Sequence, residues 1–217
     1  MHLDPEILQR KGARKIEDIP QNVLQLLNEG IIETVNLTEW LAADQLKLLK
    51  IILKDLKQED WYPIIEKEVL AQKKRTANSD CKIIGQQFSA LLDDPHRINQ
   101  LSQHPSDFVR SWACWAISHR IQDLEQLAQE MKIFAADAHF GLREVVIFAS
   151  KDKFAAELDK SLVILGPWAQ SSDENIRRYL VEMLRPIGVW TKKIPALVAD
   201  PAPMLPILES LKSDTSK

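Results

Sequence analysis

The sequence has little glycine and no glycine-rich phosphate loop. Only six glycines occur among 217 residues, and neither GxGxxG nor GxxxxGK[ST] is present. Nucleotide sites of the Rossmann and P-loop kinds need such glycines because the backbone must approach the phosphates closely. Sustained period-two alternation and hairpin dipeptides such as Asn-Gly are missing as well. The sequence therefore favours neither those nucleotide-binding folds nor a β-sheet protein.

Cysteine, paired histidines and long apolar runs are equally scarce. Cys81 and Cys114 have no CxxC motif, so we expect two reduced thiols rather than a disulfide or a metal site. The five histidines show neither HxxxH nor HxH spacing, and we expect no metal and no cofactor. The longest apolar stretch, 46–56, is interrupted by lysines and is too short to span a membrane. No signal peptide is visible, so we expect a cytoplasmic protein without a membrane partner.

An excess of positive charge is also missing. Lysine and arginine together number 28 against 31 aspartates and glutamates, which gives a formal net charge of −3. A strongly basic nucleic-acid-binding domain would show the opposite balance. Any contact with nucleic acid must therefore come from cations gathered on one face, and the total charge predicts weak, local engagement.

What the sequence does contain is the helical spacing of apolar residues, as in Leu158, Leu162 and Leu165. Eleven prolines cut the chain into segments the length of one helix or a helix pair. The sequence predicts an all-α fold. We expect helices near 21–29, 38–56, 59–75, 80–93, 106–119, 122–135, 140–151, 154–169, 173–185, 190–199 and 204–212.

Three segments in the second half resemble one another: SDFVRSWACWAIS from 106, HFGLREVVIFASK from 139 and DENIRRYLVEMLR from 173. They place Arg110, Arg143 and Arg177 at spacings of 33 and 34 residues. We interpret these arginines as structural: each is expected to bind a carboxylate at the helix start of a neighbouring repeat, such as Asp107 or Asp173. The repeating unit is a helical hairpin, which cannot bury its apolar stripe alone and must stack on its neighbours.

Stacking of such hairpins predicts a right-handed solenoid of antiparallel helix pairs, similar to HEAT repeats, with a concave binding face. We expect one domain over 1–217, with an N-terminal helical region at about 1–104, the clearest repeats at about 105–200 and a capping helix at about 201–213. We also expect a monomer.

The helical period assigns one face of each repeat to the core and the opposite face to solvent. In the last repeat, Ile176, Leu180, Met183 and Ile187 form the inward stripe. The residues opposite these stripes form one column per repeat: Ser111, Trp115 and Ser118; Glu144, Phe148 and Lys151; Arg178, Glu182 and Arg185. Stacking predicts that Glu144 lies beside Arg178 and Phe148 beside Glu182.

These columns have two interpretations. An exposed face of ion pairs spaced by three or four residues accounts for the charged members by solvation alone. A large aromatic side chain opposite the core stripe, such as Phe148 or Trp115, is either covered by another element or available to a ligand.

Two longer motifs lie near the two ends of the chain. The N-terminal one is RKGARKIEDIPQNVLQLLNEGIIETVNLTEWLAADQLKLL, and the C-terminal one is DENIRRYLVEMLRPIGVW followed by KIPALVADPAPMLPILESLKSD. Together with the three repeats, they resemble the AlkC branch of the AlkC/AlkD superfamily, HEAT-like-repeat DNA glycosylases that act in DNA alkylation repair. The resemblance implies a metal-independent hydrolase that removes cationic bases such as N3-methyladenine from duplex DNA. By that resemblance, the active site includes Glu144, Arg178, Glu182 and Trp190, the last of them after Arg185-Pro186.

The implied chemistry suits these residue types. A cationic base leaves without a general acid, so the barrier lies in the positive charge that develops on the deoxyribose. A carboxylate, Glu144 or Glu182, stabilises that charge and positions the attacking water. We expect Arg178 to orient a carboxylate or bind a phosphate, and further DNA contacts from Arg185 and Lys151. Three aromatic residues offer a π-face to a cation: Trp190, Trp115 and Phe148.

Two other functions remain open on the sequence. The first is a noncatalytic HEAT-like protein that binds damaged or branched DNA by shape. The second is a protein-interaction scaffold, which a net charge of −3 suits.

Overall fold

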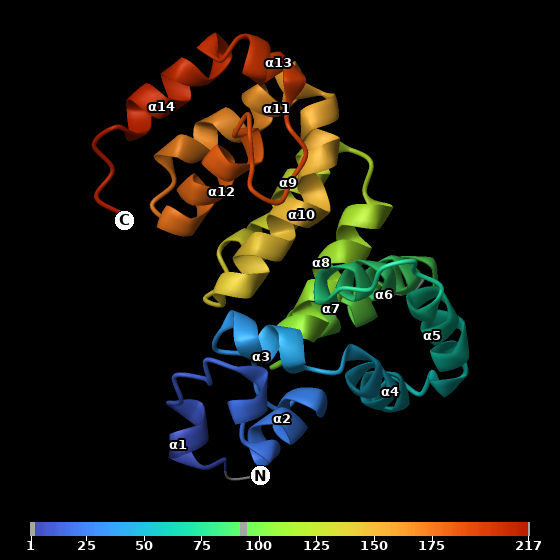
Figure 1. Cartoon of the computed structure of the whole chain (residues 1–217). Helices are drawn as coiled ribbons and strands as arrows, with labels where there is room; N and C mark the ends of the chain where they lie inside the picture. Colours follow the sequence, from blue (N-terminus) through green and yellow to red (C-terminus); the bar gives the residue numbers. More distant parts are fainter. Residues whose placement is uncertain (1–2, 92–94, 217) are drawn as a thin grey trace. The chain divides into compact units, whose positions relative to one another are not determined.

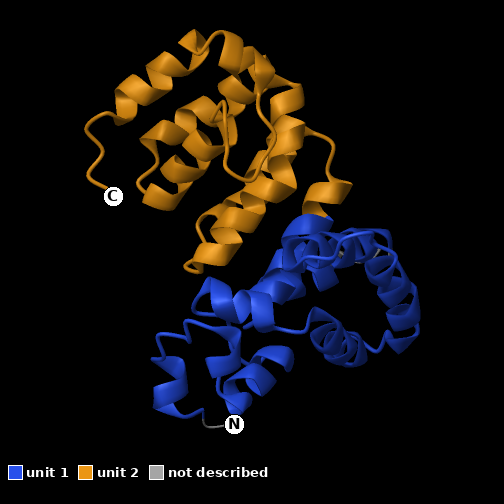
Figure 2. Cartoon of the chain, viewed as in Figure 1, with its two compact units in different colours: residues 1–116 blue, residues 117–217 orange. Residues whose placement is uncertain are grey.

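Every regular element is a helix in the part of the chain that the computed structural model describes, residues 3–91 and 95–216 (Figure 1). This confirms the prediction of an all-α protein. The chain folds into two compact units, residues 1–116 and 117–217 (Figure 2). In the described part, no helix is both long enough and apolar enough to cross a membrane.

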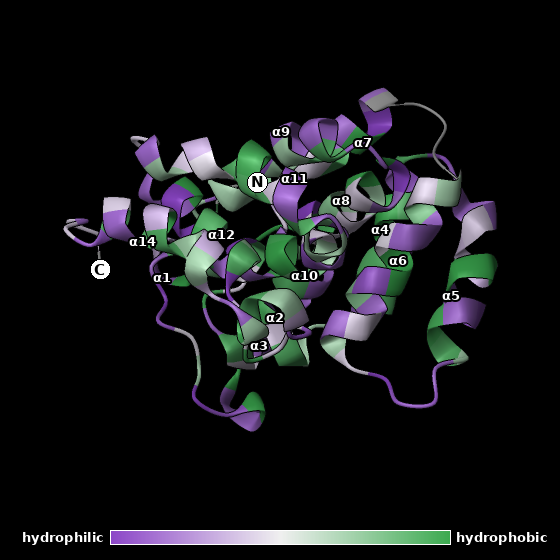
Figure 3. Ribbon diagram, turned by 90° about the horizontal axis from the view of Figure 1, so that it is seen from above, coloured by the Kyte–Doolittle hydropathy of each residue, from purple (hydrophilic) through white to green (hydrophobic). Residues whose placement is uncertain are grey.

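Unit 1 contains, in chain order, α1 (Pro5–Leu8), η1 (Ile16–Asp18), α2 (Gln21–Asn28), α3 (Leu37–Ala42), α4 (Gln45–Asp55), η2 (Glu59–Trp61), α5 (Tyr62–Leu70), α6 (Ala77–Leu91), α7 (Pro95–Ser102) and most of α8 (Asp107–Arg120). Hydrophobic and hydrophilic residues alternate in bands along single helices such as α5 and α6 (Figure 3). This is the pattern of helices that bury one face.

Unit 2 contains the end of α8 followed by α9 (Leu124–Ala135), α10 (Phe140–Ala156), α11 (Leu158–Leu165), η3 (Gly166–Gln170), α12 (Glu174–Leu184), α13 (Pro195–Ala199), η4 (Ala202–Met204) and α14 (Leu205–Leu211). α10 packs against α9, α11 and α12, and η3 packs against α11, α12 and α14. The candidate residues of the last two repeats therefore lie on neighbouring helices.

One predicted helix, 38–56, is in fact two. The chain is extended at Ala43 (ψ 136°), and Asp44 accepts hydrogen bonds from the backbone N–H groups of Leu46 and Lys47. Asp44 therefore caps the N-terminus of α4, and α3 ends before it. The sequence prediction treated Asp44 as an interior helix residue because the apolar spacing continues across it.

Other helix boundaries also differ from the prediction, among them three in unit 2. α10 continues to Ala156 instead of ending at 151, and α11 ends at Leu165, before Pro167. Of the predicted helix 190–199, only α13, from Pro195, is helical. The prediction that the preceding helix ends near Pro186 is confirmed, because Arg185 is extended (ψ 123°), the conformation that a following proline favours.

The core of unit 1 is built around paired aromatic rings. Trp40 stacks on Phe108 with ring centroids 4.1 Å apart, and Phe88 meets Trp112 edge to face at 5.8 Å. The Trp112 Nε1–H donates to Gln45 Oε1 at 3.0 Å, so the polar end of this buried ring is satisfied.

Both cysteines are buried thiols in unit 1, as predicted, and neither is part of a disulfide. Burial raises the pKa of Cys81 and that of Cys114. Neither thiol therefore has the lowered pKa of a reactive cysteine.

The core of unit 2 confirms most of the predicted apolar stripe. Ile176, Leu180 and Met183 are buried on α12. The prediction is wrong for Ile187, whose side chain is 52% exposed, because α12 ends at Leu184 and the helical period no longer applies.

Candidate functional site

The three repeated arginines have the same local structure in all three places. In each, Nη1 donates to the backbone carbonyls six and five residues earlier: Arg110 to His104 and Pro105 (2.8 and 2.9 Å), Arg143 to Asp137 and Ala138 (2.7 Å each), and Arg177 to Ser171 and Ser172 (2.8 and 3.2 Å). Each arginine is the fourth residue of its helix, α8, α10 or α12. The sequence repeat is therefore also a structural repeat.

The loop before each of these helices repeats too. In each loop, one side chain accepts a hydrogen bond from the backbone N–H two residues later. His104 accepts from Ser106, Asp137 from His139, and Ser171 from Asp173. The prediction that the arginine of a neighbouring repeat binds Asp173 is wrong, because the Asp173 carboxylate caps α12 by accepting from the Asn175 N–H. The arginine folds back onto the loop carbonyls instead.

Arg177 also binds Asp214, beyond the end of α14, through both Nε and Nη2. This pairing holds the pKa of Asp214 well below its usual range. A depressed carboxylate pKa contributes stability that is present above the ordinary pKa of about 4 and is lost as the pH falls below it.

We therefore expect Asp214→Asn to lower the melting temperature at pH 7 and to flatten the dependence of melting temperature on pH between about pH 5 and pH 2. Thermal unfolding monitored by circular dichroism across that range measures both. Asp200→Asn is the control, because it removes an exposed carboxylate near the C-terminus that accepts from the Ala202 N–H. Parallel curves for wild type and Asp214→Asn would contradict the assignment.

The first pair of candidate site residues lies between two helices. Arg178 on α12 donates from Nη2 to Glu144 Oε1 on α10. Both side chains remain accessible, with 41% and 45% of their surface exposed. The prediction that Glu144 lies beside Arg178 is confirmed, because α10 and α12 are packed neighbours with the same helix start.

The second pair lies at the C-terminal end of α12, where Arg185 directly follows the helix. Arg185 Nη1 contacts Glu182 Oε1 at 3.1 Å and Oε2 at 3.3 Å. Glu182 is four residues after Arg178, so the two side chains share one face of α12. Phe148, which the sequence places beside Glu182, is half-buried on α10. Two carboxylates and two guanidinium groups thus occupy the adjoining faces of α10 and α12.

Lys151 does not extend into solvent as predicted. It is 2% exposed, and its Nζ donates to the backbone carbonyls of Glu182 and Arg185, each at 3.0 Å. Burial lowers the pKa of Lys151; Glu182 opposes this shift and Arg185 adds to it. The lysine caps the C-terminus of α12. The helical period predicted that Lys151 faces solvent, because that prediction assumes that a helix has only one covered face. α10 is covered from more than one side.

Lys153 caps the C-terminus of α8 as Lys151 caps that of α12, and it was not among the predicted site residues. Its Nζ donates to the backbone carbonyls of Ser118 and Ile121 at the end of α8. Burial lowers the pKa of Lys153. Two lysines on α10 therefore bind the C-terminal carbonyls of the helices that precede and follow it in the repeat, as cations do at helix ends.

The predicted exposed column of the first repeat is largely buried. Ser111 and Ser118 are buried, and their hydroxyls donate to the carbonyls of Asp107 and Ala149. Trp115 is half-buried in unit 1, where Lys82 Nζ lies 5.3 Å from its ring centroid. The side chain of Trp115 packs against α6 of its own unit.

Trp190 is the most exposed of the candidate residues, at 81%. It lies in the loop between α12 and α13 rather than in the predicted helix. The loop is closed at its base by a hydrogen bond from the Ile194 N–H to the Pro186 carbonyl (3.0 Å), and an ion pair between Lys192 and Asp152 (2.7 Å) joins it to α10. An exposed tryptophan on a loop with a closed base is available to a ligand.

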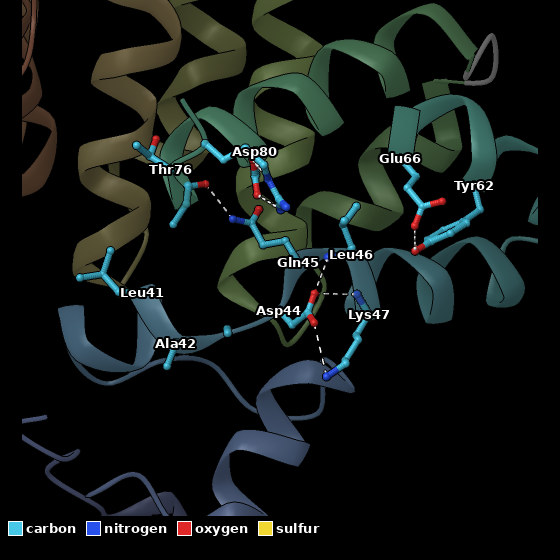
Figure 4. A pocket seen from close by; sticks show the side chains of 13 residues that line it. Leu41, Ala42, Asp44, Gln45, Leu46, Lys47, Tyr62, Glu66, Thr76 and Asp80 are labelled. Carbon is cyan, nitrogen blue, oxygen red and sulfur yellow. Dashed lines mark hydrogen bonds and ion pairs between the residues drawn. The ribbon is translucent and has the colours of Figure 1, made fainter. Parts of the chain in front are cut away.

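Cavities in the described part of the chain include three that are lined by residues other than the candidates. One of about 660 Å³ lies in unit 1, where the starts of α4, α5 and α6 contribute Asp44, Tyr62, Glu66 and Asp80 to its wall (Figure 4). Its polar groups are largely paired with one another; Tyr62, for example, donates to Glu66 at 2.8 Å, and burial with this contact raises its pKa to about 12. The candidate residues do not line this cavity, and Glu144, Arg178 and Trp190 are accessible on the surface.

No cluster of three or more histidines, cysteines, aspartates or glutamates suited to a metal ion occurs among residues 3–91 and 95–216.

Comparison with known proteins gives one partial match. YhaZ of Bacillus subtilis (strain 168), an uncharacterized protein, is 41% identical over 69 residues. These residues make up 32% of this chain and 19% of YhaZ, so the matched part spans about a fifth of that relative. No family model matches the chain, and no solved structure matches it.

Proposed function

We propose that this chain is a DNA alkylation repair protein, a glycosylase that hydrolyses the N-glycosidic bond of cationic alkylated bases such as N3-methyladenine in duplex DNA. The observation that carries the proposal is the Glu144–Arg178 ion pair between α10 and α12, with Glu182 and Arg185 on the adjoining face. The resemblance of the sequence to the AlkC branch assigns the active site to these same positions.

The proposal includes a HEAT-like solenoid of stacked helical hairpins. Its support is the threefold recurrence of one loop-and-helix structure at spacings of 33 and 34 residues. The packing of α10 against both α9 and α12 is what stacked repeats require. A repeated helix start aligns residues that follow the arginine, such as Glu144 and Arg178, on one surface.

In the proposed reaction, the positive charge of the methylated base makes it a good leaving group. As the glycosidic bond breaks, charge develops on the deoxyribose, and a fixed carboxylate beside the sugar stabilises it. Glu144 and Glu182 supply that carboxylate and orient the attacking water, as in glycoside hydrolysis. Arg178 fixes the orientation of Glu144, and Trp190 offers an indole face to the cationic base.

The test is release of methylated bases from duplex DNA treated with a methylating agent, measured by chromatography against the spontaneous rate. We expect release by the wild type and loss of release in the double variant Glu144→Gln, Glu182→Gln. Glu130→Gln, an exposed carboxylate on α9, is the matched control and should behave as the wild type. Release at the spontaneous rate by the wild type would refute the enzymatic function.

A noncatalytic DNA-binding protein is the second candidate. The observation that favours it is that both candidate carboxylates are ion-paired to arginines on an open surface. This function predicts binding to damaged or branched duplexes that weakens steeply with salt. Charge reversal at Arg178 and Arg185 would abolish that binding, and no base would be released.

A further inference from the structure

The three repeated arginines differ on the edge of the guanidinium that faces away from the loop. In the first repeat, Arg110 Nη2 donates to Glu33 Oε2 at 2.8 Å. In the third, Arg177 donates from Nε and Nη2 to the two oxygens of Asp214, at 2.5 and 2.8 Å. In the second, Arg143 uses only Nη1. Its Nε and Nη2 have no partner among residues 3–91 and 95–216.

This edge of Arg143 is held ready for an anion. The two Nη1 hydrogen bonds, each 2.7 Å, fix the planar guanidinium on the loop carbonyls in the same way as in Arg177. In Arg177, the same fixation directs Nε and Nη2 at a carboxylate, which the group binds with both donors. Because the guanidinium is rigid, Arg143 presents the same two-donor geometry, which matches a carboxylate or a phosphate.

The helix dipole favours negative charge at this place. Arg143 lies in the first turn of α10, a helix of 17 residues, whose N-terminus carries the positive end of the helix dipole. The following residue is Glu144, whose carboxylate is bound by Arg178. An anion at Arg143 therefore lies next to the proposed active site.

We propose that Arg143 binds a phosphodiester of the DNA strand beside the Glu144–Arg178 pair. This inference rests on the proposed function, because the proposed substrate, DNA, carries phosphodiesters next to the reacting sugar. The contact positions the strand and reads no sequence. In the flanking repeats, the protein's own carboxylates occupy the equivalent edge, so only the second repeat binds the strand in this way.

The experiment compares Arg143→Gln with Arg177→Gln. Both variants remove one guanidinium and the same two Nη1 hydrogen bonds, but only Arg143 has a free outer edge. Fluorescence anisotropy measures the Kd for a methylated duplex at several salt concentrations. We expect Arg143→Gln to weaken binding about tenfold, as for loss of a charge-assisted hydrogen bond. It should also lower the slope of log Kd against log salt by about one.

Arg177→Gln should leave that slope unchanged. Equal changes in both variants, or an unchanged slope in Arg143→Gln, would overturn the inference while leaving the proposed function standing. Absence of DNA binding by the wild type would overturn both.

A second variant covers the case in which Arg143→Gln fails to fold. Arg143→Lys keeps the charge, but its single ammonium cannot bind the loop carbonyls and a phosphate with the same geometry. We expect it to bind DNA severalfold more weakly than the wild type at an unchanged melting temperature. Binding as tight as the wild type would contradict the two-donor contact.

Discussion

Glu144→Gln and Glu182→Gln are each expected to lower the rate of base release by at least about 100-fold, the size of effect seen when a group that stabilises developing charge is removed. The amide keeps the shape of the side chain but loses the negative charge that, in the proposed reaction, stabilises the sugar cation. Because both side chains lie on the surface, neither substitution should change the melting temperature by more than a few degrees.

The ion pair gives this prediction a sharper form. If Arg178 acts by orienting Glu144, then Arg178→Ala and Glu144→Gln affect the same step, and combining them should cost no more than the larger single effect. Single-turnover rates of the two single variants and the double variant measure this coupling. Glu130→Gln is again the control. Additive losses would show that Arg178 and Glu144 act separately, and unchanged rates would remove both from the reaction.

Gly85→Val is expected to destabilise unit 1 by about 3 kcal/mol, the upper range for forcing extra atoms into a packed core. Gly85 lies in α6, where an added Cβ would be 2.4 Å from Trp115 Cβ and 2.6 Å from the Trp112 carbonyl oxygen. The second of these atoms is backbone, so α6 and α8 would have to separate. Valine has a higher helix propensity than glycine, so the loss would come from packing alone.

Chemical denaturation of the full chain measures this loss, and the control is Gln86→Val on the next, half-buried residue of α6. We expect the control to stay within about 0.5 kcal/mol of the wild type, as most substitutions outside the core do. Gly85→Ala should fall between the two. Equal stability of Gly85→Val and wild type would show that the helices do not approach this closely.

The sequence predicted contacts between candidate residues most successfully where the pattern was local and repeated. The position of the arginine in each repeat fixed the relative alignment of α10 and α12, and from it the contact between Glu144 and Arg178 was correctly predicted. The same reasoning failed for Lys151, because the helical wheel of one helix contains no information about how many neighbours cover it. It failed for Ile187 because the helix ended one turn earlier.

The sequence alone determined that the protein is all-α and that its second half repeats, since helical periodicity, capping residues and prolines act over a few residues. Only the tertiary structure decided which of the arginine donors in the described part bind a carboxylate and which remain available to a ligand. Arg110 and Arg177 bind carboxylates 77 and 37 residues away, whereas Arg143 keeps the equivalent edge open within residues 3–91 and 95–216. Partners this far apart in the sequence are brought together by tertiary packing, and no local sequence pattern predicts them.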